Sequence, residues 1–493
     1  MVNSRQGDHT MEHIVWECIS GEKSVKICED IYGGFVEHLG RNVYGGIYDP
    51  ASPLADEEGF RKDVLTLIRE LSTPVTRYPG GSCMGLFRWE DGIGPQWERK
   101  AKLDPAWHQL EPNTFGLDEF IKWCRKAGTE PLITLNIANR SLMDTASLYE
   151  YCNFPGGTCW SDKRKENGAE MPYHIRKWCL GNELYGEWEF GTKTAEEYGV
   201  LAREHAKVLR QLDPDCFLIL CGKPDDMEWN RTVLKHCGEY ADCLSLHNVF
   251  CPNNKTLQEY LRTVDAFDLA VTETEKVCQE IAESVPRCRK ISICVDEWIL
   301  WDFDHRLNEK EKWTTGMHLL EQDYTIKEAL ITGSLLSLFH RHAATIRLGC
   351  IAQSVNVLAP IRTEKDSCWK QSIFYPFSLT SRYGRGESLP IREHGNEQHS
   401  LYGSVVRNDQ NELVLFVTNR SEEKVLWEFQ NKQKTSLVQT QTLHGIDPEK
   451  VNTPECDHFI PVENQLSLRE GSGNFFAELP PLSWNMIRLQ RQQ

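Results

Sequence analysis

The stretch Lys177-Trp178-Cys179-Leu180-Gly181-Asn182-Glu183 runs from an apolar segment through a glycine into two polar residues. A short apolar segment that ends in this way is typical of a buried strand of a parallel sheet. A second stretch, Ile291-Ser292-Ile293-Cys294-Val295-Asp296-Glu297-Trp298, has the same form. We therefore predict two buried strands, each of which delivers a glutamate at its carboxyl end.

Further segments of this kind occur between Asp30 and Phe377, separated by longer segments of helical period. In chain order the strand candidates are Gly34–His38, Pro74–Tyr78, Pro131–Asn136, Lys177–Glu183, Phe217–Gly222, Cys243–Phe250, Ile291–Trp298 and Ile346–Ala352. The alternation indicates repeated βα units, and eight is the number of strands in a closed α/β barrel.

The intervening segments have the apolar faces expected of helices that cover a barrel. These are Phe60, Val64, Leu67, Ile68 and Leu71 on one face, and the long amphipathic segments Glu196–Leu212 and Leu257–Ser284. An open doubly wound sheet would alternate similarly, but it needs a glycine-rich phosphate turn before a helix, and Pro79-Gly80-Gly81 does not have that pattern. We expect a (β/α)8 TIM barrel.

The character of the chain changes after about Tyr383. Leu401–Val406 and Leu413–Thr418 read as strands joined by a polar turn, and short strand-like segments continue to Trp484–Leu489. We predict a C-terminal all-β sandwich domain over residues 383–493, after a catalytic barrel over residues 30–382. Residues 1–29 contain two strand-like pieces, which we expect to join the sandwich.

Composition narrows the classes of partner. The net charge of −17 and the absence of a Lys/Arg-rich run disfavour nucleic acid and anionic lipid. The first twenty residues lack a signal-peptide pattern, and the apolar segment Ala329–Phe339 is too short to cross a bilayer, so we expect a buried helix there and a cytoplasmic protein. The 18 cysteines have no disulfide-framework or metal-ligand spacing, and we expect reduced thiols, no metal and no cofactor.

The two strand-end glutamates suit the hydrolysis of an acetal. In a barrel, residues at the carboxyl ends of strands face one mouth, and strands four and seven would bring Glu183 and Glu297 there. One carboxyl group then protonates the leaving oxygen while the other faces the anomeric carbon. A gap of roughly 5–5.5 Å implies retention of configuration and a wider gap implies inversion, which the spacing alone leaves open. Structural ion pairs are the non-catalytic alternative.

Several motifs resemble, in chain order, those of glycoside hydrolase family 51, the α-L-arabinofuranosidases. They are Phe35-Val36-Glu37-His38-Leu39-Gly40-Arg41, Tyr44-Gly45-Gly46-Ile47-Tyr48, Arg77-Tyr78-Pro79-Gly80-Gly81, Asp91-Gly92-Ile93-Gly94-Pro95, Glu111-Pro112-Asn113, Gly181-Asn182-Glu183, Asp296-Glu297-Trp298 and Ala352-Gln353-Ser354-Val355-Asn356-Val357. The resemblance extends from about Asp30 to the C-terminus.

The resemblance implies a retaining enzyme that removes terminal non-reducing arabinofuranosyl residues from arabinose-containing oligosaccharides, and often a homo-oligomer such as a hexamer. Glu183 matches the family's acid/base and Glu297 its nucleophile. The positions that match substrate-binding residues are Glu37, Arg77, Ser82, Trp107, Asn182, His247, Trp301 and Gln353. Asn182 matches the residue that contacts the sugar 2-hydroxyl.

Catalysis by this pair sets a requirement on charge. Glu297 must be ionised to attack, and Arg77 would favour that state by pairing with Glu297 or Glu37. Glu183 must begin protonated, so we expect burial and the neighbouring carboxylate to raise its pKa.

The chain departs from the family at two pocket positions. Ser82 stands where Pro-Gly-Gly-Asn is common, and Val249 stands where a tyrosine usually follows the histidine by two residues. The acid/base motif also differs downstream, at Leu184–Trp188. These changes leave open a different glycone, such as a β-xyloside or another furanoside such as a galactofuranoside, because sugar recognition depends on pairing each hydroxyl. A catalytically weakened sugar-binding barrel and a metal-dependent hydrolase are the remaining alternatives.

Overall fold

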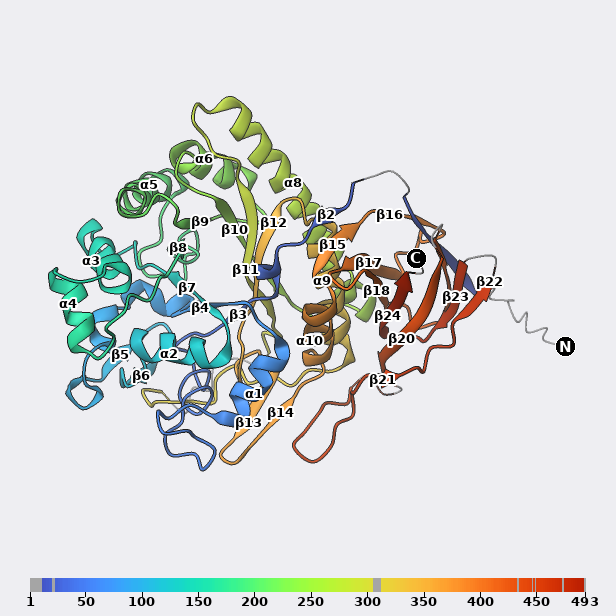
Figure 1. Cartoon of the computed structure of the whole chain (residues 1–493), viewed down its shortest axis with the longest axis horizontal. Helices are drawn as coiled ribbons and strands as arrows, with labels where there is room; N and C mark the ends of the chain where they lie inside the picture. Colours follow the sequence, from blue (N-terminus) through green and yellow to red (C-terminus); the bar gives the residue numbers. More distant parts are fainter. Residues whose placement is uncertain are drawn as a thin grey trace.

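In the computed structural model of the chain, eight parallel strands form one sheet in the order β12-β11-β10-β9-β8-β7-β4-β3 (Figure 1). They are β3 Gly34–Phe35, β4 Val75–Tyr78, β7 Glu130–Thr134, β8 Lys177–Leu180, β9 Phe217–Cys221, β10 Cys243–Phe250, β11 Ser292–Leu300 and β12 Ile346–Ile351. Backbone bonds from Gly33 N to Gly349 O (2.7 Å) and from Ile351 N to Gly33 O (3.1 Å) bring the two edges together. The predicted (β/α)8 barrel is confirmed.

Gly33 is required at this closure. A Cβ atom on it would lie 2.6 Å from the Gly349 carbonyl oxygen and 2.7 Å from Cys350 Sγ, so no side chain fits between the two edges. Strands β3 and β8 are shorter than predicted, because the chain leaves the sheet after Phe35 and Leu180 and turns into the loops above the barrel.

The structure describes residues 11–19, 23–304, 312–431, 434–445, 447, 449–471 and 474–491. Residues 1–10 and 20–22, which belong to the predicted N-terminal segment 1–29, lie outside the described residues. In the described part of the chain, no helix combines the length and apolar character needed to cross a bilayer. All 18 cysteines are unpaired.

Helices cover the outside of the barrel (Figure 1). They are α1 Lys62–Leu71, α2 Leu117–Ala127, α3 Leu142–Asn153, α4 Cys159–Glu166, α5 Ala195–Leu212, α6 Met227–Cys237, α7 Leu257–Leu261, α8 Thr263–Ser284, α9 Ile326–Arg341 and α10 Phe374–Tyr383. Thr194 and Glu197 start α5 as a reciprocal capping box. The segment predicted as one helix over Leu257–Ser284 is two helices that break at Arg262.

Two antiparallel-rich sheets form the strand domain, consistent with the predicted sandwich. The seven-stranded sheet has the order β2-β15-β17-β18-β24-β20-β21, with bounds Val25–Lys26, Gly386–Leu389, Leu401–Asn408, Glu412–Asn419, Ser483–Arg491, Thr435–His444 and Val462–Glu463. The five-stranded sheet has the order β16-β1-β19-β23-β22, with bounds Ile391–His394, Glu12–Cys18, Val425–Gln430, Asn474–Leu479 and Arg469–Gly471. The chain thus enters both sheets, through β1 and β2, before it enters the barrel.

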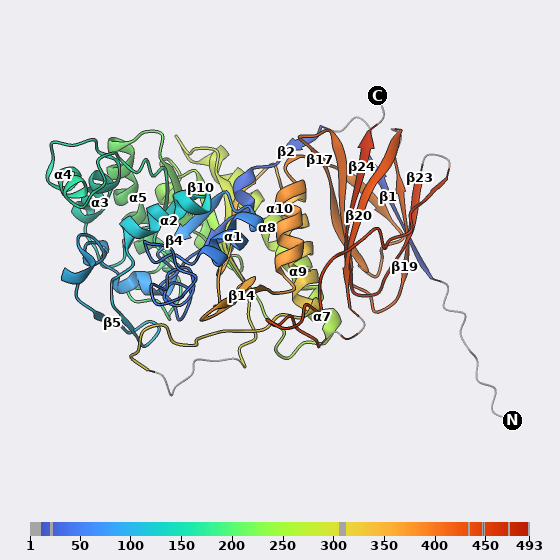
Figure 2. The ribbon, with the colours of Figure 1, turned by 60° about the horizontal axis from the view of Figure 1, so that its bottom comes forward.

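Helix α9 lies between the barrel and the seven-stranded sheet (Figure 2). The predicted buried helix at Ala329–Phe339 is confirmed, because every residue of that segment is buried. Contact with the sheet is closest at Gly333, where a Cβ atom would lie 2.2 Å from Trp484 Cδ1. Such an interface fixes the position of the strand domain against the barrel wall that carries the site.

Candidate active site

Glu183 projects from the turn that follows β8. Gly181 (φ 92°) and Glu183 itself (φ 42°) both have left-handed backbone conformations, which turn the chain sharply at the barrel mouth. Three donors surround the carboxyl group: Tyr185 Oη lies 3.1 Å from Oε1, and Trp188 Nε1 lies 2.9 Å from Oε2. The third, His247 Nδ1, lies 2.9 Å from Oε1.

Glu297 lies within β11, and Arg77 of β4, a strand that is not adjacent to β11 in the sheet, holds it. Arg77 Nη1 donates to Glu297 Oε2 at 2.6 Å, and Arg77 Nε lies 3.2 Å from Asp296 Oδ2. Consecutive residues of a regular strand point to opposite faces, yet both carboxylates reach one guanidinium. The register shift between Val295 and Trp298 in the pairing of β11 with β12 accommodates this.

His247 joins the two glutamates. Its Nδ1 lies 2.9 Å from Glu183 Oε1 and 3.5 Å from Glu297 Oε2. These two carboxylate oxygens therefore lie within about 6.4 Å of each other, which is compatible with the roughly 5–5.5 Å between the carboxyl groups of retaining enzymes. The arrangement favours direct attack by one carboxylate.

The pKa shifts of Glu183 and Glu297 differ from the expectation. Burial would raise the pKa of Glu183, but the hydrogen bond and charge of His247, with Trp188 and Tyr185, outweigh it and lower that pKa. Burial raises the pKa of Glu297, and the Glu183 charge adds to it, against His247 and Arg77. The expected raised pKa of Glu183 is therefore wrong.

The proton that Glu183 lacks is on His247. Burial would lower the pKa of His247, but Glu297, Asp296 and Glu183 together raise it to about 10. Asp296 stays ionised, because Arg77 and His247 outweigh burial and hold its pKa below the ordinary value. At neutral pH the site thus holds an imidazolium hydrogen-bonded to Glu183.

A cavity of about 490 Å³ opens beside the two glutamates. Glu37, Ser82, Trp107, Glu183, Glu297, Trp301 and Gln353 line it, which is seven of the ten residues predicted from the sequence. Of the other three, Arg77 and His247 contact the lining residues Glu297 and Glu183, and Asn182 contacts Arg77 and Glu189. The rest of the lining is apolar: Leu39, Pro105, Ala106, Trp188, Phe190, Val249, Ile299, Phe303, Leu320, Ala352 and Leu358.

The polar end of the cavity is built around Glu37. Trp107 Nε1 donates to its Oε1 at 3.0 Å, and Gln353 Nε2 donates to its Oε2 at 2.7 Å. Trp107 comes from the turn between β5 Lys102–Asp104 and β6 Gln109–Glu111. Burial and the Glu297 charge raise the pKa of Glu37 to about 8, so this carboxyl group is largely neutral at pH 7. It can both donate to and accept from a sugar hydroxyl.

Comparison with known proteins gives a consistent result. Residues 67–260 match the family model described as the alpha-L-arabinofuranosidase 1 domain, and residues 296–483 match the alpha-L-arabinofuranosidase C-terminal domain. The chain is 39% identical over 492 residues to the intracellular exo-alpha-(1->5)-L-arabinofuranosidase 1 of Bacillus subtilis, covering 96% of this chain and 98% of that protein. The chain belongs to glycoside hydrolase family 51.

Other arabinofuranosidases are also similar. The chain is 35% identical to the exo-alpha-(1->6)-L-arabinofuranosidase of Bifidobacterium longum, over 93% of this chain and 94% of that protein. Among solved structures, a family 51 α-L-arabinofuranosidase from Bifidobacterium longum superposes with a TM-score of 0.92 at 31% identity, covering 98% of this chain and 100% of that one. An arabinose complex of the Thermotoga maritima enzyme gives 0.86 at 30% identity, with 98% and 100% covered.

The two departures from the family 51 pattern both lie at the cavity. Val249 is 39% exposed and carries no hydrogen-bonding group to offer Glu297. Tyr185 does supply a phenol, but it donates to Glu183 instead. The Ser82 hydroxyl donates to Glu189 at 2.7 Å.

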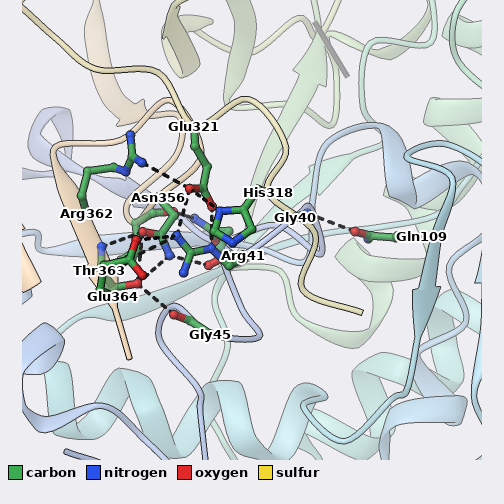
Figure 3. A network of polar contacts seen from close by, with 12 residues as sticks. Gly40, Arg41, Gly45, Gln109, His318, Glu321, Asn356, Arg362, Thr363 and Glu364 are labelled. Atoms are coloured by element: carbon green, nitrogen blue, oxygen red, sulfur yellow. Dashed lines mark hydrogen bonds and ion pairs between the residues drawn. The ribbon is translucent and has the colours of Figure 1, made fainter. Parts of the chain in front are cut away.

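A polar network gathers around Glu321 (Figure 3), the residue that follows Leu320 of the cavity lining. Arg41 makes two bonds to Glu321, of 2.6 and 2.9 Å, and Arg362 lies 3.2 Å from the same carboxylate. Arg362 belongs to β13 Ile361–Glu364, which pairs with β14 Ser367–Lys370. This network anchors the loop near the cavity to the first βα loop of the family 51 barrel and to the hairpin.

Residues that the sequence did not single out complete the site: Tyr185, Trp188, Glu189 and Asp296. Asp296 is adjacent to Glu297, but strand alternation predicts that it points away. The others follow Glu183 within six residues in a loop, where sequence carries no signal of which side chains turn inward. In the described part of the chain, no group of three or more His, Cys, Asp or Glu side chains is arranged to hold a metal ion.

Proposed function

We propose that this protein is an exo-acting α-L-arabinofuranosidase that removes terminal non-reducing arabinofuranosyl residues with retention of configuration. Two relatives of similar length that are named as exo-acting arabinofuranosidases support the substrate class. The observation that carries the retaining mechanism is that His247 Nδ1 bridges one oxygen of each glutamate, which keeps these two oxygens within about 6.4 Å and is compatible with the close carboxyl pair of retaining enzymes.

The surroundings of each glutamate support its role. Glu297 is the nucleophile, because its closest partner is the Arg77 guanidinium, which favours the ionised form. Glu183 is the acid/base, because it bonds to Trp188, a cavity residue that is 63% exposed, so a leaving group protonated by Glu183 can depart into solvent. Asn182, Glu37 and Gln353 hold the sugar at the polar end.

The route of the catalytic proton follows from the contact between Glu183 and His247. The developing alkoxide is more basic than imidazole, so the His247 Nδ1 proton moves through Glu183 to the glycosidic oxygen as Glu297 attacks the anomeric carbon and the alcohol leaves. In the second half-reaction Glu183 takes a proton from water, whose oxygen displaces Glu297, and the proton returns to His247. Each cycle consumes one water and restores all three side chains.

A mechanism-based furanosyl inhibitor tests the proposal. We expect it to label the protein once, with the added mass on the peptide that contains Glu297, while Glu297→Gln stays unlabelled. Hydrolysis of an aryl α-L-arabinofuranoside gives the activity control. Binding of the inhibitor without covalent mass would favour a sugar-binding barrel, and activity that disappears with a chelator would favour a metal-dependent hydrolase.

A different glycone, a β-xyloside or a galactofuranoside, is the second candidate. It rests on Ser82 and Val249, which remove hydrogen-bonding reach from the cavity wall. We expect kcat/KM for aryl α-L-arabinofuranoside to rise in the double variant Ser82→Asn, Val249→Tyr. A panel of aryl furanosides and pyranosides measures the preference. Unchanged kinetics in this variant, with arabinofuranoside the best substrate, exclude the second candidate.

We further propose a cytoplasmic homo-oligomer that acts on arabinofuranose-containing oligosaccharides, with no nucleic-acid or membrane partner. Similar proteins named as intracellular and the net charge of −17 support the location and partners. Light scattering of the purified protein tests the oligomer.

The division into residues 1–29, 30–382 and 383–493 is part of the proposal. Activity on linear and branched arabino-oligosaccharides would distinguish the (1->5) and (1->6) linkages named for its relatives.

A further inference from the structure

Glu189 is a buried carboxyl group in the turn between β8 and α5. Only 5% of its surface is exposed, whereas its neighbours Glu187 and Trp188 are exposed. Glutamate is rarely buried to this extent unless its oxygens are paired. It belongs neither to the catalytic pair nor to the cavity lining, so its partners show what it does.

Its partners are two residues of the sugar site. Glu189 Oε1 accepts hydrogen bonds from Ser82 Oγ at 2.7 Å and from Asn182 Nδ2 at 3.1 Å. On its other side, Asn182 Oδ1 accepts from Arg77 Nη2 at 2.7 Å, and Arg77 Nη1 donates to Glu297 Oε2 at 2.6 Å. One hydrogen-bonded chain therefore connects Glu189 to the nucleophile.

The chain determines which way each group faces. An asparagine amide can flip, but Arg77 has only donors and must meet Oδ1, while a carboxyl oxygen on the opposite side must meet Nδ2. This leaves Asn182 one N–H for a ligand. Ser82 donates its only O–H to Glu189, so toward the cavity its oxygen can only accept a hydrogen bond.

We propose that Glu189 is a positioning residue that fixes Asn182 as a donor and Ser82 as an acceptor toward the bound sugar. The inference rests on the proposed function, whose site it deepens. Glu189 touches no reacting atom and acts through Asn182, so its effect requires that side chain. Discrimination among sugars follows, because a hydroxyl placed at Ser82 must donate and one placed at Asn182 must accept.

Only an acceptor oxygen is needed for this role. Burial and the charges of Glu183 and Glu297 raise the pKa of Glu189 to about 8, against the hydrogen bonds from Ser82 and Asn182. The charge of Glu189 in turn contributes to the raised pKa of Glu37. At pH 7 the Glu189 carboxyl group is thus mostly neutral, and the amide oxygen of glutamine would accept the same two bonds.

Steady-state kinetics on aryl α-L-arabinofuranoside at pH 7 test the inference with Glu189→Gln, Glu189→Leu, Asn182→Ala and the double variant Glu189→Leu, Asn182→Ala. Glu187→Gln, an exposed carboxylate of the same turn, is the matched control. We expect Glu189→Leu to lose about tenfold or more in kcat/KM, equivalent to about 1.4 kcal/mol. Glu189→Gln stays within about threefold of wild type. In the Asn182→Ala background the loss from Glu189→Leu shrinks, because the pair acts as one unit.

Three results would overturn the inference: wild-type kinetics in Glu189→Leu, equal losses in Glu189→Gln and Glu189→Leu, or a full additional loss in the Asn182→Ala background. Thermal unfolding checks that each variant folds, and Glu189→Ala replaces Glu189→Leu and decides by the same comparisons where the leucine variant does not fold. Failure of the proposed function is distinguishable, because the wild type itself would then not hydrolyse the arabinofuranoside.

Discussion

Replacing Glu183 by alanine separates the two catalytic roles. The change removes the carboxyl group that lies 2.9 Å from both His247 Nδ1 and Trp188 Nε1, and it leaves the bond between Arg77 and Glu297 in place. Attack by Glu297 should therefore persist, while protonation of the leaving oxygen should not. In the proposed mechanism His247 acts only through Glu183, so its proton has no route to the leaving oxygen in this variant.

The expected loss depends on the leaving group. General acid catalysis contributes about 10²–10⁴-fold, or about 2.7–5.4 kcal/mol, when the departing alkoxide needs a proton. We expect a loss of this size in kcat/KM for methyl α-L-arabinofuranoside. A para-nitrophenolate leaves without protonation, so kcat/KM for that glycoside should fall by no more than about tenfold, whereas kcat falls further because the glycosyl-enzyme accumulates.

Steady-state and burst kinetics on the two glycosides measure these losses, with thermal unfolding as the folding control. Sodium azide adds a second readout, since the anion fits where the carboxylate was and attacks the glycosyl-enzyme. We expect arabinosyl azide with retained configuration. Equal losses on both glycosides, or an azide product of inverted configuration, would refute the assignment, because the second result is what loss of the nucleophile produces.

Three further predictions concern stability. Arg77→Met removes the guanidinium that pairs with two buried carboxylates and should lower the free energy of unfolding by about 3–5 kcal/mol in urea titrations, with Arg77→Lys recovering part of it. Gly333→Val would place a side chain against Trp484 and should cost about 1–3 kcal/mol, seen as a lower Tm with kcat unchanged. Burial of His247 opposes its charge, but carboxylates raise its pKa from 6.5 to about 10, so its stabilisation is complete below about pH 6.5 and is lost as the pH rises through about 10. The difference in unfolding free energy between wild type and His247→Gln should therefore shrink over that range, and a constant difference would contradict the shift.

The barrel could be predicted because its signals are local. The strand Lys177–Leu180 can be predicted from an apolar run that ends at glycine. Helix α5 can be predicted from the helical period of its apolar residues and from its capping residues Thr194 and Glu197. A helix end that no Gly or Pro marks could not be predicted. Arg262 does not ordinarily end a helix, so the sequence predicted one helix over Leu257–Ser284 where the structure has two.

The sequence by itself determined that Glu183 and Glu297 meet at one barrel mouth, because strand order and strand ends place them there. Only the tertiary structure decided that Arg77 pairs with Glu297, that Glu189 turns inward to Asn182, and that the proton lies on His247. The physical reason is that these depend on contacts between distant segments of the chain. The charge on each group is the sum of burial and of several neighbouring fields, which no local pattern records.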